Sequence, residues 1–170
     1  MYIKSPKILD TDVSDAVKGD KDAFARLIHN NKVSMYRIAK NILKNEYDIE
    51  DAIGNSLLKA YENINKLRKN ESFKPWLLRI LINECYSLIK KSKRESASLE
   101  PDTAYEDNYR NFELIKAVKS LEQGQRVVTI LFYYEDMSIK EIAKTLCLPE
   151  GTVKSRLSRA KERLKSLINY

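Results

Sequence analysis

Apolar and polar positions recur with a helical period most clearly at residues 138–164. Two amphipathic patterns follow one another there, and a short break separates them. The apolar positions of the first pattern are Ile139, Ile142, Ala143 and Leu146. The second pattern runs from residue 149 to about residue 168, and its apolar positions are Val153, Leu157, Ala160, Leu164 and Leu167. The spacing predicts two short helices, each with one buried face.

Local signals place the start of the first helix and the break. Ser138 is a good N-cap, and Glu141 follows three residues later, which predicts a capping box. Cys147-Leu148-Pro149 makes the break, because proline lacks the amide that a continuing helix needs. Pro149 is also suited to open the next helix, since its fixed φ costs nothing there. Two short helices joined by such a turn form a helix-turn-helix.

The outer face of the second helix is basic and polar. From Lys154 onward, only Glu162 opposes the cations on this helix, which are Lys154, Arg156, Arg159, Lys161, Arg163 and Lys165. In a helix-turn-helix the second helix enters the major groove, and its N-terminal half contacts base edges. The alternative is an amphipathic helix whose charged face is merely solvated. The capping box, the position of the turn and the small polar residues beside the cations favour DNA binding.

The first half of the chain carries further helical patterns. One covers residues 12–18 and stops at Gly19, and the next is capped by Asp20 and ends near Asn45. Asp48 is the predicted N-cap of a third helix, with Asp51 three residues later. A polar loop at residues 63–72 leads to the longest pattern, residues 73–91. These elements predict a bundle of helices joined by short connections.

The second half adds two helical patterns, at residues 112–121 and 125–134, before the helix-turn-helix. Residues 95–109 between the halves contain five acidic residues and no basic one. Such a segment should not fold alone and marks a domain boundary. We therefore expect an all-α protein of two small helical domains joined by a flexible acidic linker. The expected domains are residues 1–94 and 112–170, and the expected linker is residues 95–111.

Composition narrows the function classes. The formal net charge of +7 over 170 residues makes a polyanionic partner plausible. Cys85 and Cys147 lie in apolar patterns, so we expect buried free thiols in a reducing compartment, without zinc spacing. With no signal peptide or long apolar run, the chain is expected to be cytoplasmic and not to span a membrane. His29 is the single histidine, and no catalytic constellation stands out, so we expect no enzyme, no cofactor and no metal.

The segment SIKEIAKTLCLPEGTVKSRLSRAKERL resembles the promoter-reading helix-turn-helix of bacterial sigma factors, in particular the extracytoplasmic-function group of the sigma-70 family. TVKSRLSRAKERL is its specific part. In the first half, KGDKDAFARLI, DIEDAIGNSLLKAYENI and FKPWLLRILINECYSLIKKSKR resemble successive blocks of the region-two domain of the same group. The order and spacing of the blocks make the resemblance specific.

This resemblance implies an alternative sigma factor with no covalent chemistry of its own. Its partners would be RNA polymerase core, promoter DNA and an anti-sigma factor, often membrane-anchored, that acts in a cell-envelope stress response. The region-two domain would bind polymerase and stabilise melted −10 DNA, and the second domain would bind −35 duplex. The linker would thread through polymerase toward the active-site cleft.

The resemblance also assigns roles to residues. The −35 contacts would be Thr152, Lys154, Ser155, Arg156, Ser158 and Arg159. The −10 contacts would be Lys66, Arg68, Lys69, Asn70, Asn83, Tyr86, Lys90, Lys91, Lys93 and Arg94. The polymerase contacts would be Asp48, Glu50, Asp51, Leu57 and Leu58.

Structural roles compete with some of these assignments. Cations at the end of the long helix also suit the helix dipole, Trp76 fits a buried stripe, and Asn83 can brace a loop. Family members usually have Gln-Glu where this chain has Gly54-Asn55, and glycine inside a helix costs roughly 1 kcal/mol relative to alanine.

A self-sufficient dimeric helix-turn-helix repressor is the alternative function. It predicts tight binding to palindromic duplex without polymerase. The −10-like segment and the acidic linker have no task in that scheme.

Overall fold

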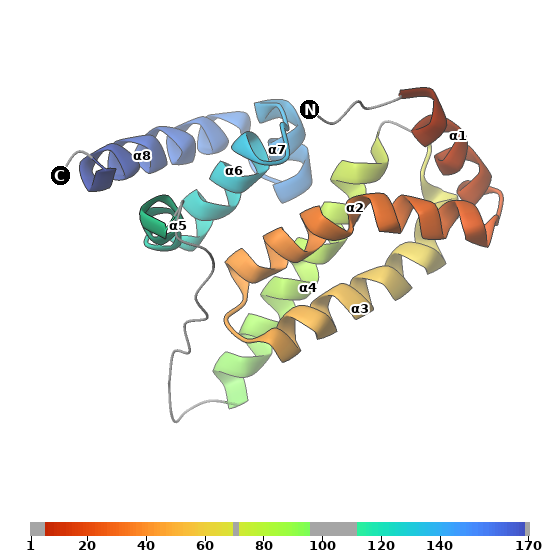
Figure 1. Cartoon of the computed structure of the whole chain (residues 1–170), viewed down its shortest axis with the longest axis horizontal. Helices are drawn as coiled ribbons and strands as arrows, with labels where there is room; N and C mark the ends of the chain where they lie inside the picture. Colours follow the sequence, from red (N-terminus) through yellow and green to blue (C-terminus); the bar gives the residue numbers. More distant parts are fainter. Residues whose placement is uncertain (1–5, 70–71, 96–111, 169–170) are drawn as a thin grey trace.

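The computed structural model describes residues 6–69, 72–95 and 112–168, and those ranges contain helices and no strand. Four α-helices and one 3₁₀ turn make the N-terminal bundle: α1 (Pro6–Val17), α2 (Lys21–Ile42), α3 (Glu46–Asn63), η1 (Ile64–Lys66) and α4 (Phe73–Glu95). The C-terminal bundle consists of α5 (Phe112–Lys119), α6 (Gln123–Tyr133), α7 (Ile139–Leu146) and α8 (Glu150–Ile168). The all-α prediction is confirmed (Figure 1).

In the N-terminal bundle, α3 packs along α4, and α1 packs on α2 (Figure 1). The largest side chains of this core come from α2 and α4. They are fully buried: Leu27, Met35, Ile38, Leu77, Leu78, Leu81 and Ile82. Cys85 is also buried, as predicted. Both helices therefore present one continuous apolar face to the core, as their helical period requires.

Helix starts in this bundle follow capping chemistry. Asp20 caps α2 as predicted, because its Oδ1 accepts hydrogen bonds from the amides of Asp22 at 2.8 Å and Ala23 at 3.0 Å. The predicted cap at Asp48 is wrong. Asn45 caps α3 instead, and its Oδ1 accepts from the Asp48 amide at 2.8 Å. Asparagine and aspartate are equally good caps, so the earlier of the two begins the helix.

Other boundaries differ from the prediction, among them the end of α2, which lies at Ile42 and not near Asn45. Helix α1 begins at Pro6, ahead of residue 12, since proline is favoured in a first turn. Helix α4 continues to Glu95, because nothing in its basic last turns breaks a helix. The loop before α4 contains the 3₁₀ turn η1. The rest of the predicted linker, residues 96–111, lies outside the described residues.

In the C-terminal bundle, α7 and α8 form the predicted pair of short helices and turn. Ser138 and Glu141 make the predicted capping box. Cys147 is the C-cap of α7 and has a left-handed backbone with φ +53°. Its side chain is exposed, so the prediction of a buried thiol is wrong here. The left-handed turn directs this residue away from the apolar face that it would continue in a helix.

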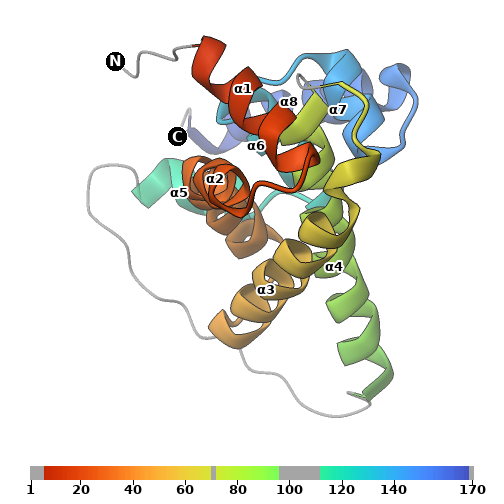
Figure 2. The same cartoon turned by 90° about the vertical axis from the view of Figure 1, so that its right-hand side faces the viewer.

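The two bundles pack against each other. Helix α7 lies against α4, and α6 lies against α2 (Figure 2). One cluster of buried apolar residues runs through both bundles and includes Leu78 on one side and Met137 and Ile142 on the other. The chain is therefore folded back on itself, an arrangement that the sequence left open. No helix in the described ranges is long and apolar enough to cross a membrane.

Candidate nucleic-acid and polymerase interfaces

Helix α8 presents a polar outer face opposite its buried stripe. Val153 and Ala160 are buried at 0% and 1% exposure, and Leu157 and Leu164 are half-buried. Leu167 is 41% exposed, so the predicted stripe ends before it, because the neighbouring helices cover only the preceding turns. The predicted −35 residues that are exposed on the outer face are Lys154, Ser155, Ser158 and Arg159. These four side chains are accessible to a duplex.

Two predicted −35 residues are less accessible. Thr152 is half-buried in the first turn of α8, where its carbonyl accepts a hydrogen bond from Ser155 Oγ at 3.0 Å. Arg156 is half-buried, and its guanidinium lies against Gly124 of α6. It also lies close enough to Tyr86 of α4 to lower the pKa of that phenol, although burial, the larger effect, raises it. Arg156 is thus turned toward the junction of the two bundles.

The predicted −10 residues lie on α4 and on the loop that precedes it. Asn83, Tyr86 and Lys90 are exposed at helical spacing on one face of α4, and Lys91 beside them is exposed too. The exposed cations of the loop are Lys66, Arg68 and Lys69. Asn70 and the side chains of Lys93 and Arg94 lie outside the described residues. The basic loop thus lies at the start of α4, and the amide and aromatic side chains follow further along the same helix on one exposed face.

Phe73 and Trp76, at the start of the same helix, belong to the core. Phe73 is 4% exposed, and Trp76 is half-buried against the apolar cluster. Their ring centroids are 6.0 Å apart. The structural interpretation of Trp76 is therefore confirmed.

The predicted polymerase residues divide between two environments. Glu50, Asp51 and Leu58 are exposed on α3, and Leu58 is 65% exposed. Asp48 is half-buried and accepts a hydrogen bond from Asn45 Nδ2 at 2.7 Å. Leu57 packs against the apolar cluster. Only three of the five side chains are thus freely accessible to a partner.

Two aromatic residues that sequence reasoning missed share the exposed face of α3. Tyr47 is 86% exposed and Tyr61 is 46% exposed. Together with Asp51, Gly54 and Leu58 they recur every three or four residues, which places them on one side of the helix. Apolar residues at helical spacing on the outer side of an amphipathic helix were the signal available in the sequence. We call Tyr47, Glu50, Asp51, Gly54, Leu58 and Tyr61 the α3 face.

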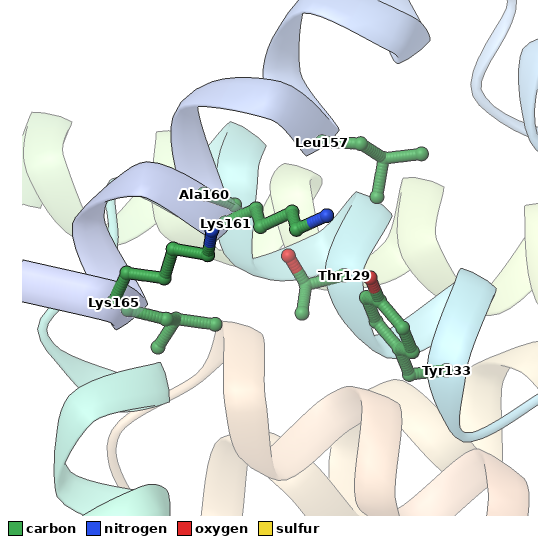
Figure 3. A pocket seen from close by; sticks show the side chains of 7 residues that line it. Thr129, Tyr133, Leu157, Ala160, Lys161 and Lys165 are labelled. Atoms are coloured by element: carbon green, nitrogen blue, oxygen red, sulfur yellow. The ribbon is translucent and has the colours of Figure 1, made fainter. Parts of the chain in front are cut away.

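A shallow groove of about 250 Å³ separates α6 from α8 (Figure 3). Its lining is mostly apolar, and Lys161 and Lys165 of α8 also line it, with Thr129 and Tyr133 on the α6 side (Figure 3). None of the predicted −35 residues lines it. Arg159 instead lines a second groove with Glu162 and Arg163 of α8 and Glu122 before α6. Within the described ranges, no group of three His, Cys, Asp or Glu side chains is placed to hold a metal ion.

Comparison with known families matches both bundles. Residues 27–95 match the family described as Sigma-70 region 2, and residues 111–164 match Sigma-70, region 4. These ranges contain the basic loop with α4 and the helix-turn-helix with α8. Fold and site thus define a helical DNA-binding protein with two sigma regions in sequence order.

Curated relatives match along nearly the whole chain. The ECF RNA polymerase sigma factor SigW of Bacillus subtilis is 31% identical, over 90% of this chain and 92% of the relative. The ECF RNA polymerase sigma factor SigM of Mycobacterium tuberculosis is 30% identical, over 91% of this chain and 81% of the relative. The chain belongs to the extracytoplasmic-function (ECF) group of sigma-70 RNA polymerase sigma factors. It is an alternative sigma factor, a DNA-binding transcription initiation factor and not an enzyme.

Two solved structures share the fold. The sigma factor RpoE of Bartonella quintana, in complex with the anti-sigma factor NepR, has a TM-score of 0.75 and 27% identity, over 86% of this chain and 96% of RpoE. CnrH, in complex with the cytosolic domain of CnrY, has a TM-score of 0.73 at 22% identity, over 95% and 97% of the two chains. Because the similarity extends through the N-terminal bundle, for which a dimeric repressor has no use, the repressor alternative is not supported.

Proposed function

We propose that the two bundles divide promoter recognition between them. Residues 1–94 bind RNA polymerase core and stabilise melted −10 DNA, residues 112–170 bind −35 duplex, and residues 95–111 connect them. The observation that carries this proposal is the order of the two family matches on two bundles, each with an exposed basic face. The protein works where RNA polymerase works, in the cytoplasm.

The −35 role rests on the outer face of α8. Arg159 is exposed there and can donate two hydrogen bonds to guanine O6 and N7, the commonest specific contact in the major groove. Lys154, Ser155 and Ser158 surround it and can bind backbone phosphates, which fix the register of the helix on the duplex. Arg156 joins this surface only when it leaves Gly124.

The −10 role rests on the loop before α4 and on the exposed face of α4. Lys66, Arg68 and Lys69 are exposed cations that can bind the phosphates of a displaced strand, and phosphate neutralisation supplies most of the affinity of such contacts. Tyr86 can stack on an unpaired base, a contact of about 1–3 kcal/mol per base. Asn83, one turn earlier on the same face, can donate and accept hydrogen bonds at a base edge.

The polymerase role rests on the α3 face. It combines the acidic Glu50 and Asp51 with the exposed apolar side chains of Tyr47, Leu58 and Tyr61. Exposed aromatic and apolar side chains at the centre of a charged surface are typical of protein interfaces. Gly54 lies among them without a side chain, so Leu58 and the tyrosines must supply the apolar contact.

An anti-sigma factor is the proposed regulator. RpoE is in complex with an anti-sigma factor, and CnrH is in complex with the cytosolic domain of a second protein, CnrY. We propose that this chain is held in the same way by an anti-sigma factor until a cell-envelope stress releases it. The accessible α3 face is a surface that such a partner would have to cover.

In vitro transcription tests the proposed function. Core polymerase is assayed with and without the full chain on a promoter library. We expect initiation from a specific subset of promoters only when the protein is added, with common sequences near −35 and −10. Loss of initiation with Leu58→Ala, beside normal initiation with Arg26→Ala on α2, outside the α3 face, would support the α3 face. Absence of any added initiation would overturn the proposal.

A further inference from the structure

Asn63 is the last residue of α3, and both ends of its side-chain amide are hydrogen-bonded. Its Nδ2 donates to the Lys59 carbonyl, one turn earlier on α3, at 2.8 Å. Its Oδ1 accepts from Lys66 Nζ at 2.6 Å. Only one of the two orientations of the amide directs a donor to the carbonyl and an acceptor to the ammonium, so the two bonds together fix the side chain.

The 3₁₀ turn η1 brings Lys66 to Asn63, because side chains three residues apart lie one above the other in such a turn. The Leu67 amide closes the turn by donating to the Ile64 carbonyl at 3.0 Å. Ile64 is 5% exposed, and Leu67 packs against the apolar cluster. Helix α1 also packs against η1. The exposed Lys66 therefore projects from a turn that the core anchors on both sides of it.

The group that holds Lys66 is neutral. A lysine ammonium has three N–H donors, and the Asn63 amide takes one of them without offsetting the positive charge. Lys59, one turn before Asn63, has a different environment, because its ammonium is paired with the Glu84 carboxylate of α4, which is 13% exposed. The charge of Lys59 is thus offset within the protein. Beside Asn63, Lys66 retains its charge and two donors with which it can bind an anion.

The pair of Lys59 and Glu84 serves the same surface. Glu84 directly follows Asn83, the amide of α4 that can bind a base edge. An unpaired carboxylate at this place would repel the phosphates of a DNA strand, since juxtaposed like charges are unfavourable. Pairing with Lys59 offsets that repulsion. One lysine of this region therefore offsets an acid, and the other, Lys66, is available to the DNA.

We propose that Asn63 is a positioning residue for −10 binding: it holds the Lys66 ammonium in place to bind one phosphate of the melted strand. The inference rests on the proposed function, because it takes Lys66 as a DNA contact. A side chain that is already held in its bound position loses little conformational freedom on binding. Lys66 therefore contributes more affinity than its charge alone would give, and Asn63 acts without touching the DNA.

Holoenzyme assembled from core polymerase and the full chain tests this role on a fork-junction probe. The probe comes from a promoter selected in the library, with duplex −35 DNA and an unpaired −10 non-template strand. By fluorescence anisotropy, we expect Lys66→Ala to weaken binding several-fold and Asn63→Ala to cause most of the same loss. Adding Asn63→Ala to Lys66→Ala should have no further effect, because Asn63 acts through that lysine. Adding it to Lys69→Ala should keep its full effect.

Neutral methylphosphonates then identify the phosphate. Each probe of a series carries one methylphosphonate in place of one phosphate of the unpaired −10 strand. At one position the replacement should weaken binding by the unmodified holoenzyme and have little further effect with Lys66→Ala or Asn63→Ala. At the other positions both variants should respond as the unmodified protein does. A merely structural role of Asn63 would lower the affinity for every probe by the same factor.

Asn41→Ala is the matched control. Asn41 Nδ2 on α2 donates to the Arg37 carbonyl at 2.8 Å, the same bond to the residue four positions earlier, and Asn41 is not among the −10 residues. In urea denaturation it should lower stability about as much as Asn63→Ala, while binding of the fork-junction probe stays unchanged.

Two results would overturn the positioning role. One is an Asn63→Ala loss that persists in full in the Lys66→Ala background, and the other is unchanged probe binding with Lys66→Ala. Failure of the unmodified holoenzyme to initiate from any promoter is a different result. It would overturn the sigma function and the positioning role with it.

Discussion

Arg156 of α8 lies directly over Gly124 of α6, and a β-carbon built on Gly124 would come within 3.1 Å of Arg156 Cζ. Arg156, a predicted DNA contact, thus packs against a glycine, the one residue type without a β-carbon to crowd it. The contact is tight but ends on a flexible guanidinium, which can move.

Gly124→Ala should therefore change stability little, although alanine is favoured over glycine in a helix by about 0.5–1 kcal/mol. Crowding against Arg156 should offset most of this gain. In an Arg156→Ala background the gain should appear in full, because the space is then open. Urea denaturation of the four proteins measures the coupling. Equal effects of Gly124→Ala in both backgrounds would show that Arg156 does not rest on Gly124 in solution.

The capping box of α7 should make stability depend on pH. Glu141 accepts hydrogen bonds from Ser138 Oγ at 2.7 Å and from the Ser138 amide at 2.8 Å. These two bonds, the first being the larger cause, lower the pKa of Glu141 from its ordinary value of 4.5. Because the folded-state pKa lies below the unfolded one, ionised Glu141 stabilises the fold above the unfolded pKa. That stability is lost as the pH falls through the folded pKa.

Ser138→Ala should lower the free energy of unfolding by about 1 kcal/mol at neutral pH, as loss of an N-cap usually does. The difference between the two proteins should shrink as the pH falls below 4.5, since protonated Glu141 has lost its part of the box. Denaturant titrations at several pH values provide the measurement. A difference that stays constant with pH would mean that Glu141 takes no part in the cap.

Local chemistry explains which parts of this structure the sequence could predict. Ser138 and Glu141 are three residues apart, so the capping box follows from the sequence alone. Asn45 and Asp48 both have side chains that cap helices well and lie in a polar stretch of sequence. Only the folded backbone shows that Asn45 is the N-cap of α3. Cys147 continues an apolar period, but the turn rotates it into solvent. Each error involves a choice between local alternatives of similar energy.

The contacts of Glu135 could not be predicted from local sequence patterns. Glu135 stands between two helices in a polar turn, where an exposed acid is unremarkable. Its hydrogen-bond partners Ser34 and Arg37 lie 101 and 98 residues away, so their convergence depends on how the bundles pack. The helices of both bundles were predictable from apolar periods, whereas the junction between the bundles was not.

Arg159→Ala should weaken discrimination at one or two positions of the −35 element. Arg159 is exposed on the outer face of α8, and a bidentate contact to guanine is worth about 1–3 kcal/mol against the wrong base. Fluorescence anisotropy with matched and single-mismatch duplexes measures the effect. Arg163→Ala, one turn further along the same groove, is the control. An equal loss on all duplexes would assign Arg159 to phosphate binding.

Gly54→Ala should stabilise the N-terminal bundle by about 1 kcal/mol, because Gly54 lies inside α3 with open space where a β-carbon would be. Affinity for polymerase core should change by no more than about twofold, the size of an ordinary surface substitution. Leu58→Ala should show the reverse, with reduced core affinity and little change in stability, since Leu58 is 65% exposed. A large loss of core affinity with Gly54→Ala would indicate that polymerase approaches the bare backbone at this position.

The two thiols should differ greatly in reactivity. Burial raises the pKa of the Cys85 thiol to about 12, and its side chain is 0% exposed. Cys147 is exposed at the end of α7. With a disulfide reagent at pH 8, we expect one rapid equivalent per chain, from Cys147, because thiolate fraction and access control the rate. Cys147→Ser should abolish the rapid phase, and Cys85→Ser should leave it intact.

Modification of Cys85 should then report opening of the N-terminal bundle. A fully buried thiol reacts only when the surrounding helices separate, so its rate should rise with denaturant in parallel with global unfolding. In the Cys147→Ser protein this slow phase can be followed alone. Gly54→Ala should slow it, because α3 and α4 pack along each other and the substitution stabilises α3. Rapid modification of Cys85 without denaturant would mean that α4 leaves the core far more often than its burial implies.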